Sequence, residues 1–207
     1  RTPVSAMKGY LSLILEGVTG PIADPTRDFI QKVINANQRL IQLVNDLLEV
    51  ARSEAGRLTI NVAPMDVAES VAAALGELKP LIDEKKIELR HEVPEQMPKV
   101  LADSDRVKEV VVNLVGNAIK YNNDGGHVWI TYEIKNDQLT IGVRDDGFGV
   151  SKDAQAKLFE KFYRVQTDKT KSIKGTGLGL FIVKEIMEKM GGKVWVESEG
   201  DGKGSAF

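Results

Sequence analysis

The sequence has 207 residues, of which 42% are hydrophobic and 28% are charged, and its formal net charge is −2. This length suits one large domain or two small ones, and the near-neutral charge argues against a nucleic-acid partner. The absence of cysteine excludes disulfides and thiolate metal sites. No apolar run is long enough to span a membrane, so no direct membrane contact is expected. Because the chain begins with Arg1 rather than Met, we expect a fragment of a longer protein.

Residues 1–57 are predicted to form a two-helix antiparallel hairpin. Apolar residues recur at steps of three and four from Arg1 to about Val18, and again from about Pro25 to Arg57. The glycines and prolines between these stretches indicate a turn. The apolar stripe of the second helix is wider than one partner helix can bury. We therefore expect two hairpins to form a dimeric four-helix bundle, the alternative being a hairpin packed on the rest of its own chain.

Residues 58–207 are predicted to form an α/β sandwich with a mixed sheet, which makes the whole chain α+β. Alternating apolar residues favour strands, and a period near 3.6 favours helices. The expected strands are Leu58–Val62, Ile87–Val93, Val128–Lys135 and Gln138–Arg144, the last two forming a hairpin. The expected helices are Met65–Lys85, Arg106–Tyr121 and the amphipathic stretch that follows Leu180.

The helix expected at Arg106–Tyr121 has one apolar face and one polar face. Asn113, Asn117 and Lys120 fall on the polar face, one turn apart. Two amide oxygens and a cation suit a hydrated Mg²⁺ and the phosphates that it carries. A solvated polar face is the alternative interpretation of this helix alone.

A carboxylate and two glycines follow the last strand of the expected hairpin. The segment reads Asp145-Asp146-Gly147-Phe148-Gly149. Glycines let the backbone approach a flat ligand closely, while the carboxylate accepts a hydrogen bond from it. A plain turn would have a similar composition.

Two further motifs come next along the chain. Residues 158–164 read LFEKFYR, and a polar run from Val165 to Lys174 follows, which buries little and is expected to be a mobile lid. The run ends at residues 175–180, GTGLGL, which open a helix. Backbone N–H groups at such a helix start can bind phosphate, although a glycine repeat alone is weak evidence.

The order of these motifs resembles the ATP-binding domain of sensor histidine kinases, a fold shared with DNA gyrase B, Hsp90 and MutL-type ATPases. The matching motifs are N-x-x-x-N-A-x-K-Y, D-x-G-x-G, F-x-x-F-Y-R, G-T-G-L-G-L and the final G-x-G-[ST]-x-F at Gly202–Phe207. The hairpin resembles the dimerisation and histidine-phosphotransfer domain of the same family, because Arg1-Thr2-Pro3 matches the end of its H-E-[LF]-R-T-P box.

The resemblance implies Mg²⁺ and ATP as cofactors and a role for each matching residue. Asn117, supported by Asn113, would coordinate Mg²⁺, and Lys120 and Arg164 would contact phosphate. Asp145 would accept a hydrogen bond from the adenine amino group. The other residues implied in nucleotide binding are Tyr121, Gly147, Gly149, Gly175, Thr176, Gly177, Leu178 and Gly179. Phe159 and Phe162 would couple the lid to the acceptor domain, or simply pack in the core.

The phosphoacceptor histidine of the family falls three residues before Arg1, and neither His91 nor His127 can replace it. The chain as written is therefore expected to bind ATP without phosphorylating itself at the usual site. Thr2 occupies the position from which a polar side chain positions water for dephosphorylation of a response regulator. A hydroxyl at a helix start is the alternative interpretation of Thr2.

The resemblance also separates the kinases from the hydrolysing ATPases of the same fold. The hydrolases carry a glutamate where this chain has Asn113, and an amide cannot act as a general base. The expected function is thus a protein-histidine kinase core, homodimeric through its hairpin, that passes phosphate to a response-regulator receiver domain. The resemblance implies a cytoplasmic location, as the cytoplasmic part of a membrane-anchored sensor. A hydrolysing ATPase and a non-catalytic binding and dimerisation module are the alternatives.

Overall fold

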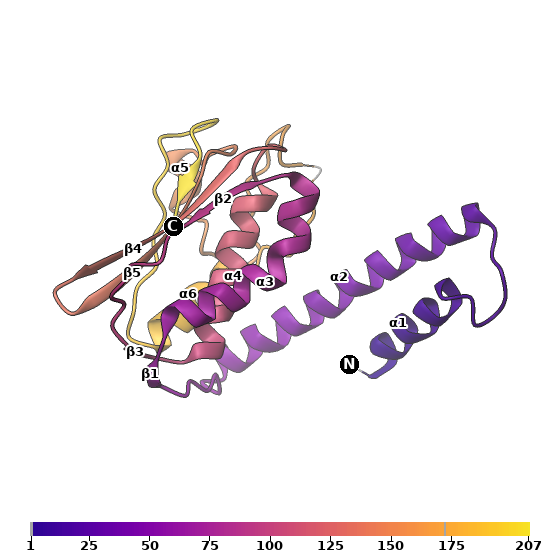
Figure 1. Ribbon diagram of the computed structural model, residues 1–207, viewed down its shortest axis with the longest axis horizontal. Coiled ribbons are helices and arrows are strands. Elements are labelled where there is room, and N and C mark those ends of the chain that lie inside the picture. Colours follow the sequence, from indigo (N-terminus) through magenta and orange to yellow (C-terminus); the bar gives the residue numbers. More distant parts are fainter. Residues whose placement is uncertain (1, 172) are drawn as a thin grey trace. The chain divides into compact units, whose positions relative to one another are not determined.

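The computed structural model describes residues 2–171 and 173–207, without the side chains of Thr2, Pro3 and Ser5. The chain divides into two compact units, residues 1–58 and residues 59–207. The α+β class predicted from the sequence, a helical hairpin followed by an α/β sandwich with a mixed sheet, is confirmed (Figure 1). No helix within the described residues is both long and apolar enough to cross a membrane.

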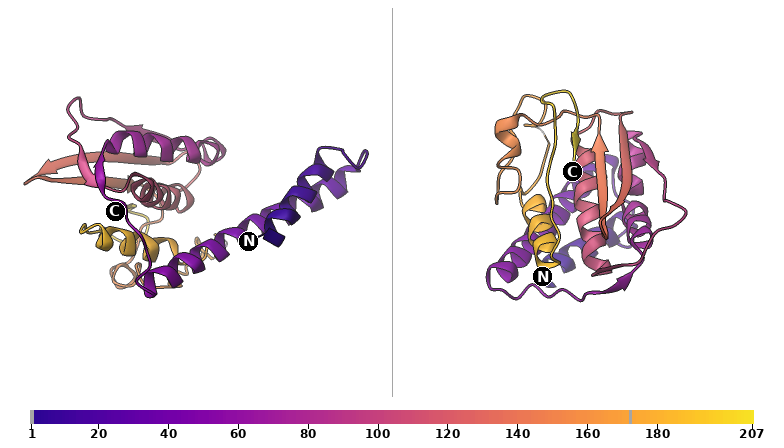
Figure 2. Two further views of the ribbon diagram at one scale, coloured as in Figure 1. Left: turned by 90° about the horizontal axis from the view of Figure 1, so that it is seen from below. Right: turned by 90° about the vertical axis from the view of Figure 1, so that its left-hand side faces the viewer.

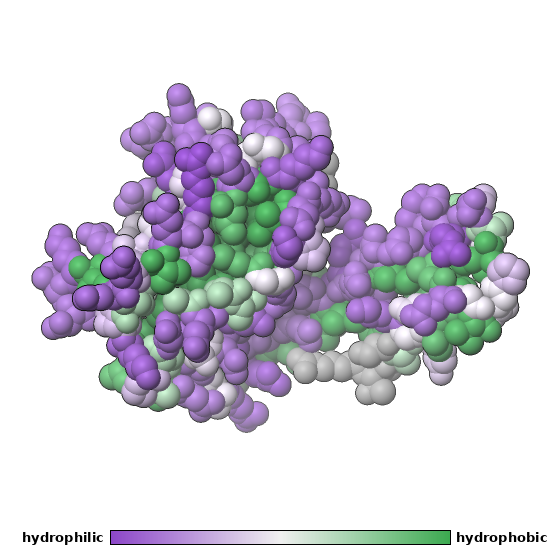
Figure 3. All heavy atoms as spheres, viewed as in Figure 1, coloured by the Kyte–Doolittle hydropathy of each residue, from purple (hydrophilic) through white to green (hydrophobic). Residues whose placement is uncertain are grey.

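The first unit is an antiparallel hairpin of α1 (Thr2–Leu15) and α2 (Asp24–Glu54). Asn37 lies on the α2 face toward α1, where its Nδ2 donates to the carbonyl oxygen of Val4 at 2.9 Å. Many large apolar side chains nevertheless stay exposed along the hairpin (Figure 3). They are Met7, Tyr10, Leu13, Val18, Phe29, Val33, Leu40, Leu43, Leu47 and Leu48. Within the described chain, therefore, one hairpin leaves its wide apolar stripe uncovered.

The second unit combines helices with two small sheets. Its helices are α3 (Val67–Lys85), α4 (Ser104–Lys120), the short α5 (Lys152–Gln155) and α6 (Gly179–Lys189). Its strands are β1 (Ala63–Met65), β2 (Glu88–His91), β3 (Val100–Ala102), β4 (His127–Lys135), β5 (Gln138–Asp145) and β6 (Ser205–Ala206). The main sheet has the order β2-β4-β5-β6, in which β2 pairs parallel to β4 and the other pairs are antiparallel.

The helical layer of this unit packs against the main sheet through α4. This helix contacts α3 on one side, α6 on the other, and both β4 and β5 beneath it. Alternate residues of β4 and β5, such as Val128 and Val143, are fully buried in this layer together with Val115 and Ile119 of α4. The β4–β5 ribbon continues past the helices to an exposed turn (Figure 2). The central position of α4 places its polar face at the edge of the core.

Two details differ from the sequence-based expectation. Leu58–Val62 is not a strand, because the backbone N–H of Asn61 donates to the Asp103 side chain instead of a ladder partner. The strand begins at Ala63 and pairs with β3, which the sequence pattern did not reveal. Asp103 is also the N-cap of α4, accepting hydrogen bonds from the backbone N–H groups of Asp105 and Arg106. The buried Asp103 therefore holds both the backbone at Asn61, just before β1, and the start of the central helix α4.

Candidate functional site

The polar face of α4 carries the first group of candidate residues. The Asn113 Nδ2 donates to the backbone oxygen of Glu109 at 3.0 Å, which fixes the amide so that its oxygen lies beside Gly179. A Cβ at Gly179 would lie only 2.6 Å from that oxygen, so the first residue of α6 contacts the face of α4. The side chain of Asn117 is half-buried and has no hydrogen bond with the described residues. Its amide is therefore available to a ligand.

The loop after β5 packs tightly on the end of α4. The carbonyl oxygen of Tyr121 accepts a hydrogen bond from the Phe148 N–H at 3.0 Å. A Cβ at Gly147 would overlap the same carbonyl oxygen and lie 2.9 Å from Asp145 Oδ1. Glycine is thus required here for the close approach of two backbone segments. The sequence-predicted Tyr121 and Gly147 are in direct contact.

Asp145 is the buried acid of this loop, with only 4% of its surface exposed. Its Oδ1 accepts from the Gly147 N–H at 2.8 Å, and its Oδ2 accepts from the Ser205 hydroxyl at 2.6 Å. Burial raises the pKa of the Asp145 carboxyl above its ordinary value, against the hydrogen bonds from Ser205 and Gly147, which lower it. Each carboxylate oxygen keeps further acceptor capacity for a ligand.

Ser205 was not among the residues predicted for the site, although it stands in the final glycine box. It lies on β6, which pairs with the end of β5 so that Ser205 is directly opposite Asp145. Gly204 packs so closely that a Cβ would overlap the backbone oxygen of Asp145. Gly149 lies against Gly200 in the same way. The carboxyl-terminal segment therefore forms one wall of the site.

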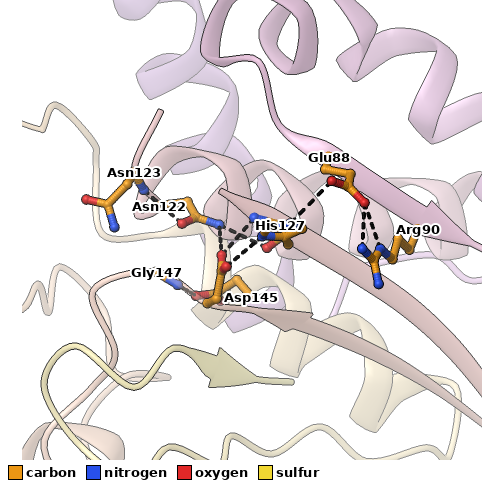
Figure 4. Close-up of polar contacts among 8 residues, drawn as sticks. Glu88, Arg90, Asn122, Asn123, His127, Asp145 and Gly147 are labelled. Carbon is orange, nitrogen blue, oxygen red and sulfur yellow. Dashed lines mark hydrogen bonds and ion pairs between the residues drawn. The ribbon is translucent and has the colours of Figure 1, made fainter. Parts of the chain in front are cut away.

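A polar network joins Asp146 to Asn122, which follows α4; Figure 4 shows Asn122, His127 and Glu88 of this network. The Nδ2 of the fully buried Asn122 donates to Asp146 Oδ1 at 3.1 Å and to the backbone oxygen of His127 at 3.0 Å. Asp146 Oδ2 lies 2.8 Å from His127 Nδ1, and Glu88 lies 3.3 Å from the other ring nitrogen. The network ties α4, β2, β4 and β5 together next to Asp145.

Two cations meet beside Gly175 in another part of the candidate site. A Cβ at Gly175 would lie 2.7 Å from Lys120 Nζ and 4.0 Å from Arg164 Nε, so both side chains border this glycine. Burial, and then the nearby guanidinium of Arg164, lower the pKa of Lys120 below its ordinary value. Arg164 donates to the backbone oxygens of Gly175 and Ile173, while its buried Nε has no partner among the described residues. Neither cation forms an ion pair with a carboxylate of the described residues, which is the arrangement expected of an anion site.

The glycine segment before α6 is shaped by local contacts. The backbone of Gly177 has a φ of +74°, and a Cβ there would lie 2.8–3.0 Å from the backbone atoms of Phe162. Thr176 Oγ1 accepts from the N–H of Leu178, and the Leu178 side chain is fully buried. Gly177 therefore joins the lid to a firmly anchored helix start.

Phe162 is exposed and has an unfavourable backbone conformation. Its φ is +62°, and 61% of its surface is accessible, whereas Phe159 is half-buried. Core packing, one of the two interpretations left open by the sequence, therefore does not apply to Phe162. A bulky residue with positive φ is a genuine outlier, and its backbone is held in place by the hydrogen bond from its N–H to the Gly177 oxygen at 2.9 Å.

The polar segment expected to be a lid contains, within its described residues, an organising residue that the sequence did not reveal. Thr170 is 5% exposed, and its hydroxyl donates to the backbone oxygen of Val165 at 2.7 Å and accepts from the Thr167 N–H at 2.9 Å. The neighbouring Lys169 places its ammonium 5.8 Å from the ring of Phe148. Thr2, the remaining predicted residue, begins α1, but its side chain lies outside the described part of the structure.

Comparison with known families identifies the class of protein first. Residues 102–207 match the model of the histidine kinase-, DNA gyrase B- and HSP90-like ATPases, and residues 1–56 match that of the His Kinase A (phospho-acceptor) domain. The chain belongs to the histidine kinase-, DNA gyrase B- and HSP90-like ATPase family. The hairpin in front of the ATPase domain places it among the two-component sensor histidine kinases.

Individual relatives agree with this assignment. The chain is 32% identical to the sensor histidine kinase WalK of Bacillus subtilis over 209 residues, which cover 100% of this chain and 34% of WalK. The crystal structure of full-length ShkA in complex with AMPPNP superposes with a TM-score of 0.81 at 32% identity, covering 100% of this chain and 42% of ShkA. The histidine kinase AdeS of Acinetobacter baumannii gives a TM-score of 0.72 at 25% identity, covering 100% of this chain and 93% of AdeS. The chain spans about a third of the length of WalK.

Proposed function

We propose that this chain is the catalytic core of an ATP-dependent protein-histidine kinase. The proposal rests on two groups in the site that are complementary to the two parts of ATP, an acceptor for the adenine and cations for the phosphates. The buried acceptor Asp145 lies in the loop that packs on Tyr121, at the end of α4, and two cations without carboxylate partners among the described residues lie beside Gly175, one of them being Lys120, the last residue of α4. An adenine amino group fits the first group and a triphosphate fits the second.

Within this proposal each residue has a definite task. Asp145, held by Ser205 and Gly147, accepts a hydrogen bond from the adenine amino group. Lys120 and Arg164 neutralise the phosphates, and the positive charge of Arg164 stabilises the group in transfer. The remaining contacts to the nucleotide come from Tyr121, Gly149, Gly175, Thr176, Gly177, Leu178 and Gly179.

The residues of α4 also fit a magnesium ion that arrives with the nucleotide. No group of three or more His, Cys, Asp or Glu side chains in the described chain could hold a metal by itself. The free amide of Asn117, with Asn113 one turn away, can instead supply oxygen ligands to an ion that keeps phosphates and water in its shell. Mg²⁺ held there would neutralise part of the negative charge of the phosphates.

The reaction moves the γ-phosphoryl group from ATP to a histidine nitrogen, which leaves ADP. The acceptor would precede Arg1 by three residues in the parent protein. The phosphoryl group then passes to an aspartate of a response-regulator receiver domain, and Thr2 would position water when the regulator is dephosphorylated. The exposed apolar residues along the hairpin support a homodimer, because a second hairpin would cover them in a four-helix bundle.

The proposal is tested with the parent protein, including the residues that precede Arg1. It is incubated with Mg²⁺ and γ-labelled ATP, and acid-labile, alkali-stable label on the protein is measured. Label on the histidine before Arg1 that is lost in Asn117→Asp is the expected result. Nucleotide binding without label would refute the kinase, and release of free phosphate would then indicate a hydrolase rather than a binding module.

A further inference from the structure

The last residue of α3, Lys85, supplies an unusual cap to the end of α4. Its Nζ donates to the backbone oxygens of Ile119, Lys120 and Asn122 at 3.2, 3.1 and 2.9 Å. The last carbonyl groups of a helix have no partners within the helix and carry its negative dipole end. A lysine commonly neutralises the end of its own helix, but this one reaches across to a neighbouring helix.

The three carbonyl groups belong to the segment where both ends of the nucleotide site meet. Lys120 supplies one of the two cations of the phosphate end. Tyr121, between two of the capped carbonyl groups, accepts the Phe148 N–H and contacts Gly147 at the adenine end. Displacement of this short segment would therefore move both ends together.

The same segment is held from its other side by the polar network of Asn122. That side chain binds Asp146 and the backbone of His127 (Figure 4), while its backbone oxygen accepts from Lys85. The backbone oxygen of Lys85 in turn accepts from the Gly125 N–H at 2.9 Å. Two strands and two helices thus converge on residues 119–125, and Lys85 supplies the only charged donor to the carbonyl groups of Ile119 and Lys120 recorded in the described chain.

We infer that Lys85 is a positioning residue for the nucleotide site, acting through the end of α4. The inference rests on the proposed function, because it concerns the site at which ATP is proposed to bind. Lys85 lies outside both segments that match family models. An ammonium group suits the position because its three donors serve three acceptors. The planar guanidinium of arginine presents its donors in a fixed fork and cannot reproduce this arrangement fully.

The test compares variants of the 207-residue chain by calorimetric titration with Mg-ATP, well below the melting temperature of each. Lys85→Met removes the donors and keeps most of the side-chain length, and we expect its Kd to rise roughly tenfold, since small displacements of binding groups have large effects. Lys85→Arg should recover part of the affinity, and it is also the informative variant if Lys85→Met does not fold.

Two control variants separate positioning from general stability. Val71→Ala removes fully buried methyl groups at the other end of α3, where Ser70 bonds to the start of α4, so it should lower the Tm and leave the Kd unchanged. Lys79→Met removes an exposed lysine of the same helix, which pairs with the exposed Asp83, and should change neither quantity.

Each outcome has a distinct meaning. If the unmodified chain does not bind Mg-ATP, the proposed function itself fails. If it binds, and Lys85→Met and Val71→Ala bind as tightly as it does, the inference about Lys85 is overturned while the proposed function stands. A second readout is the amide spectrum, in which Lys85→Met should shift Tyr121, Asn123 and Phe148 most, whereas shifts confined to α3 would contradict the inference.

Discussion

Replacement of Asp145 by Asn tests the adenine end of the site most directly. In the protein the two carboxylate oxygens accept from the Gly147 N–H and the Ser205 hydroxyl. An asparagine can keep its oxygen toward Gly147 and direct its Nδ2 to Ser205, because a hydroxyl can accept as well as donate. The fold should tolerate the change, yet the side chain would lose its negative charge and carry a donor in place of one of its two acceptors, which weakens the hydrogen bond from the adenine amino group.

The expected loss follows from the hydrogen bond that is removed. A hydrogen bond to a charged group contributes about 1.5–3 kcal/mol. With 1.4 kcal/mol for each factor of ten, Asp145→Asn should weaken Mg-ATP binding roughly ten- to 150-fold. Inosine triphosphate has a carbonyl oxygen in place of the amino group, so its binding should weaken much less or improve. The preference for ATP over inosine triphosphate should therefore fall by a similar factor.

Calorimetric titration of both nucleotides measures the two affinities. Asp137→Asn is a suitable control, because Asp137 lies in the exposed β4–β5 turn with a φ of +58°, which asparagine accepts well. It should leave both affinities unchanged. An unaltered preference for ATP in Asp145→Asn would refute the assignment of Asp145 to the adenine.

Three further changes test other parts of the site. Because the pKa of Lys120 is lowered, this side chain loses its charge at a lower pH than an ordinary lysine does. Mg-ATP affinity, measured by titration at several pH values, should therefore fall as the pH rises through this pKa. Lys120→Met should abolish this dependence. Gly177→Ala forces a Cβ against the backbone of Phe162. In the parent protein, this variant should take up label from γ-labelled ATP more slowly, while light scattering should still show a dimer. Asparagine tolerates the positive φ of Phe162 better than phenylalanine does, so Phe162→Asn should raise the Tm. The loss of the exposed ring should at the same time reduce phosphotransfer. A lower Tm would contradict the inference that the backbone of Phe162 is strained.

The fold could be predicted where local periodicity is strong. The hairpin helices, α3, α4 and the β4–β5 ribbon all show clear apolar repeats over eight or more residues. β1 and β3 have only three residues each and pair across some forty positions, so their sequences carry no local signal. The prediction of a strand at Leu58–Val62 was wrong, because an alternating apolar pattern does not show whether a second strand is present to form the backbone hydrogen bonds.

The parts of the candidate site that stand in sequence motifs could be predicted, and the parts outside motifs could not. The residues of α4 and of the loop at Asp145 stand in dense glycine and asparagine patterns, and the structure brings that loop against Tyr121 at the end of α4. Ser205 became visible only through strand pairing, because β6 has just two residues. A lysine at the end of α3 suggests a cap for its own helix, so the link from Lys85 to α4 required the packing of the two helices. Thr170 could not be predicted either, because it stands in a run of polar residues and nothing in the sequence distinguishes it from its exposed neighbours.

The arrangement around Asn113 bears on the choice between transfer and hydrolysis. Its amide is fixed by the backbone of Glu109 and faces the start of α6, where Gly179 leaves no space for an added side chain. A neutral amide held in this way can support a metal or its waters, but it cannot remove a proton from water. A proposed site that binds the triphosphate between Lys120 and Arg164 therefore has no general base at position 113 to activate water. Under the proposed function, a histidine nitrogen is itself the nucleophile, and attack on the γ-phosphoryl group does not require a base at this position.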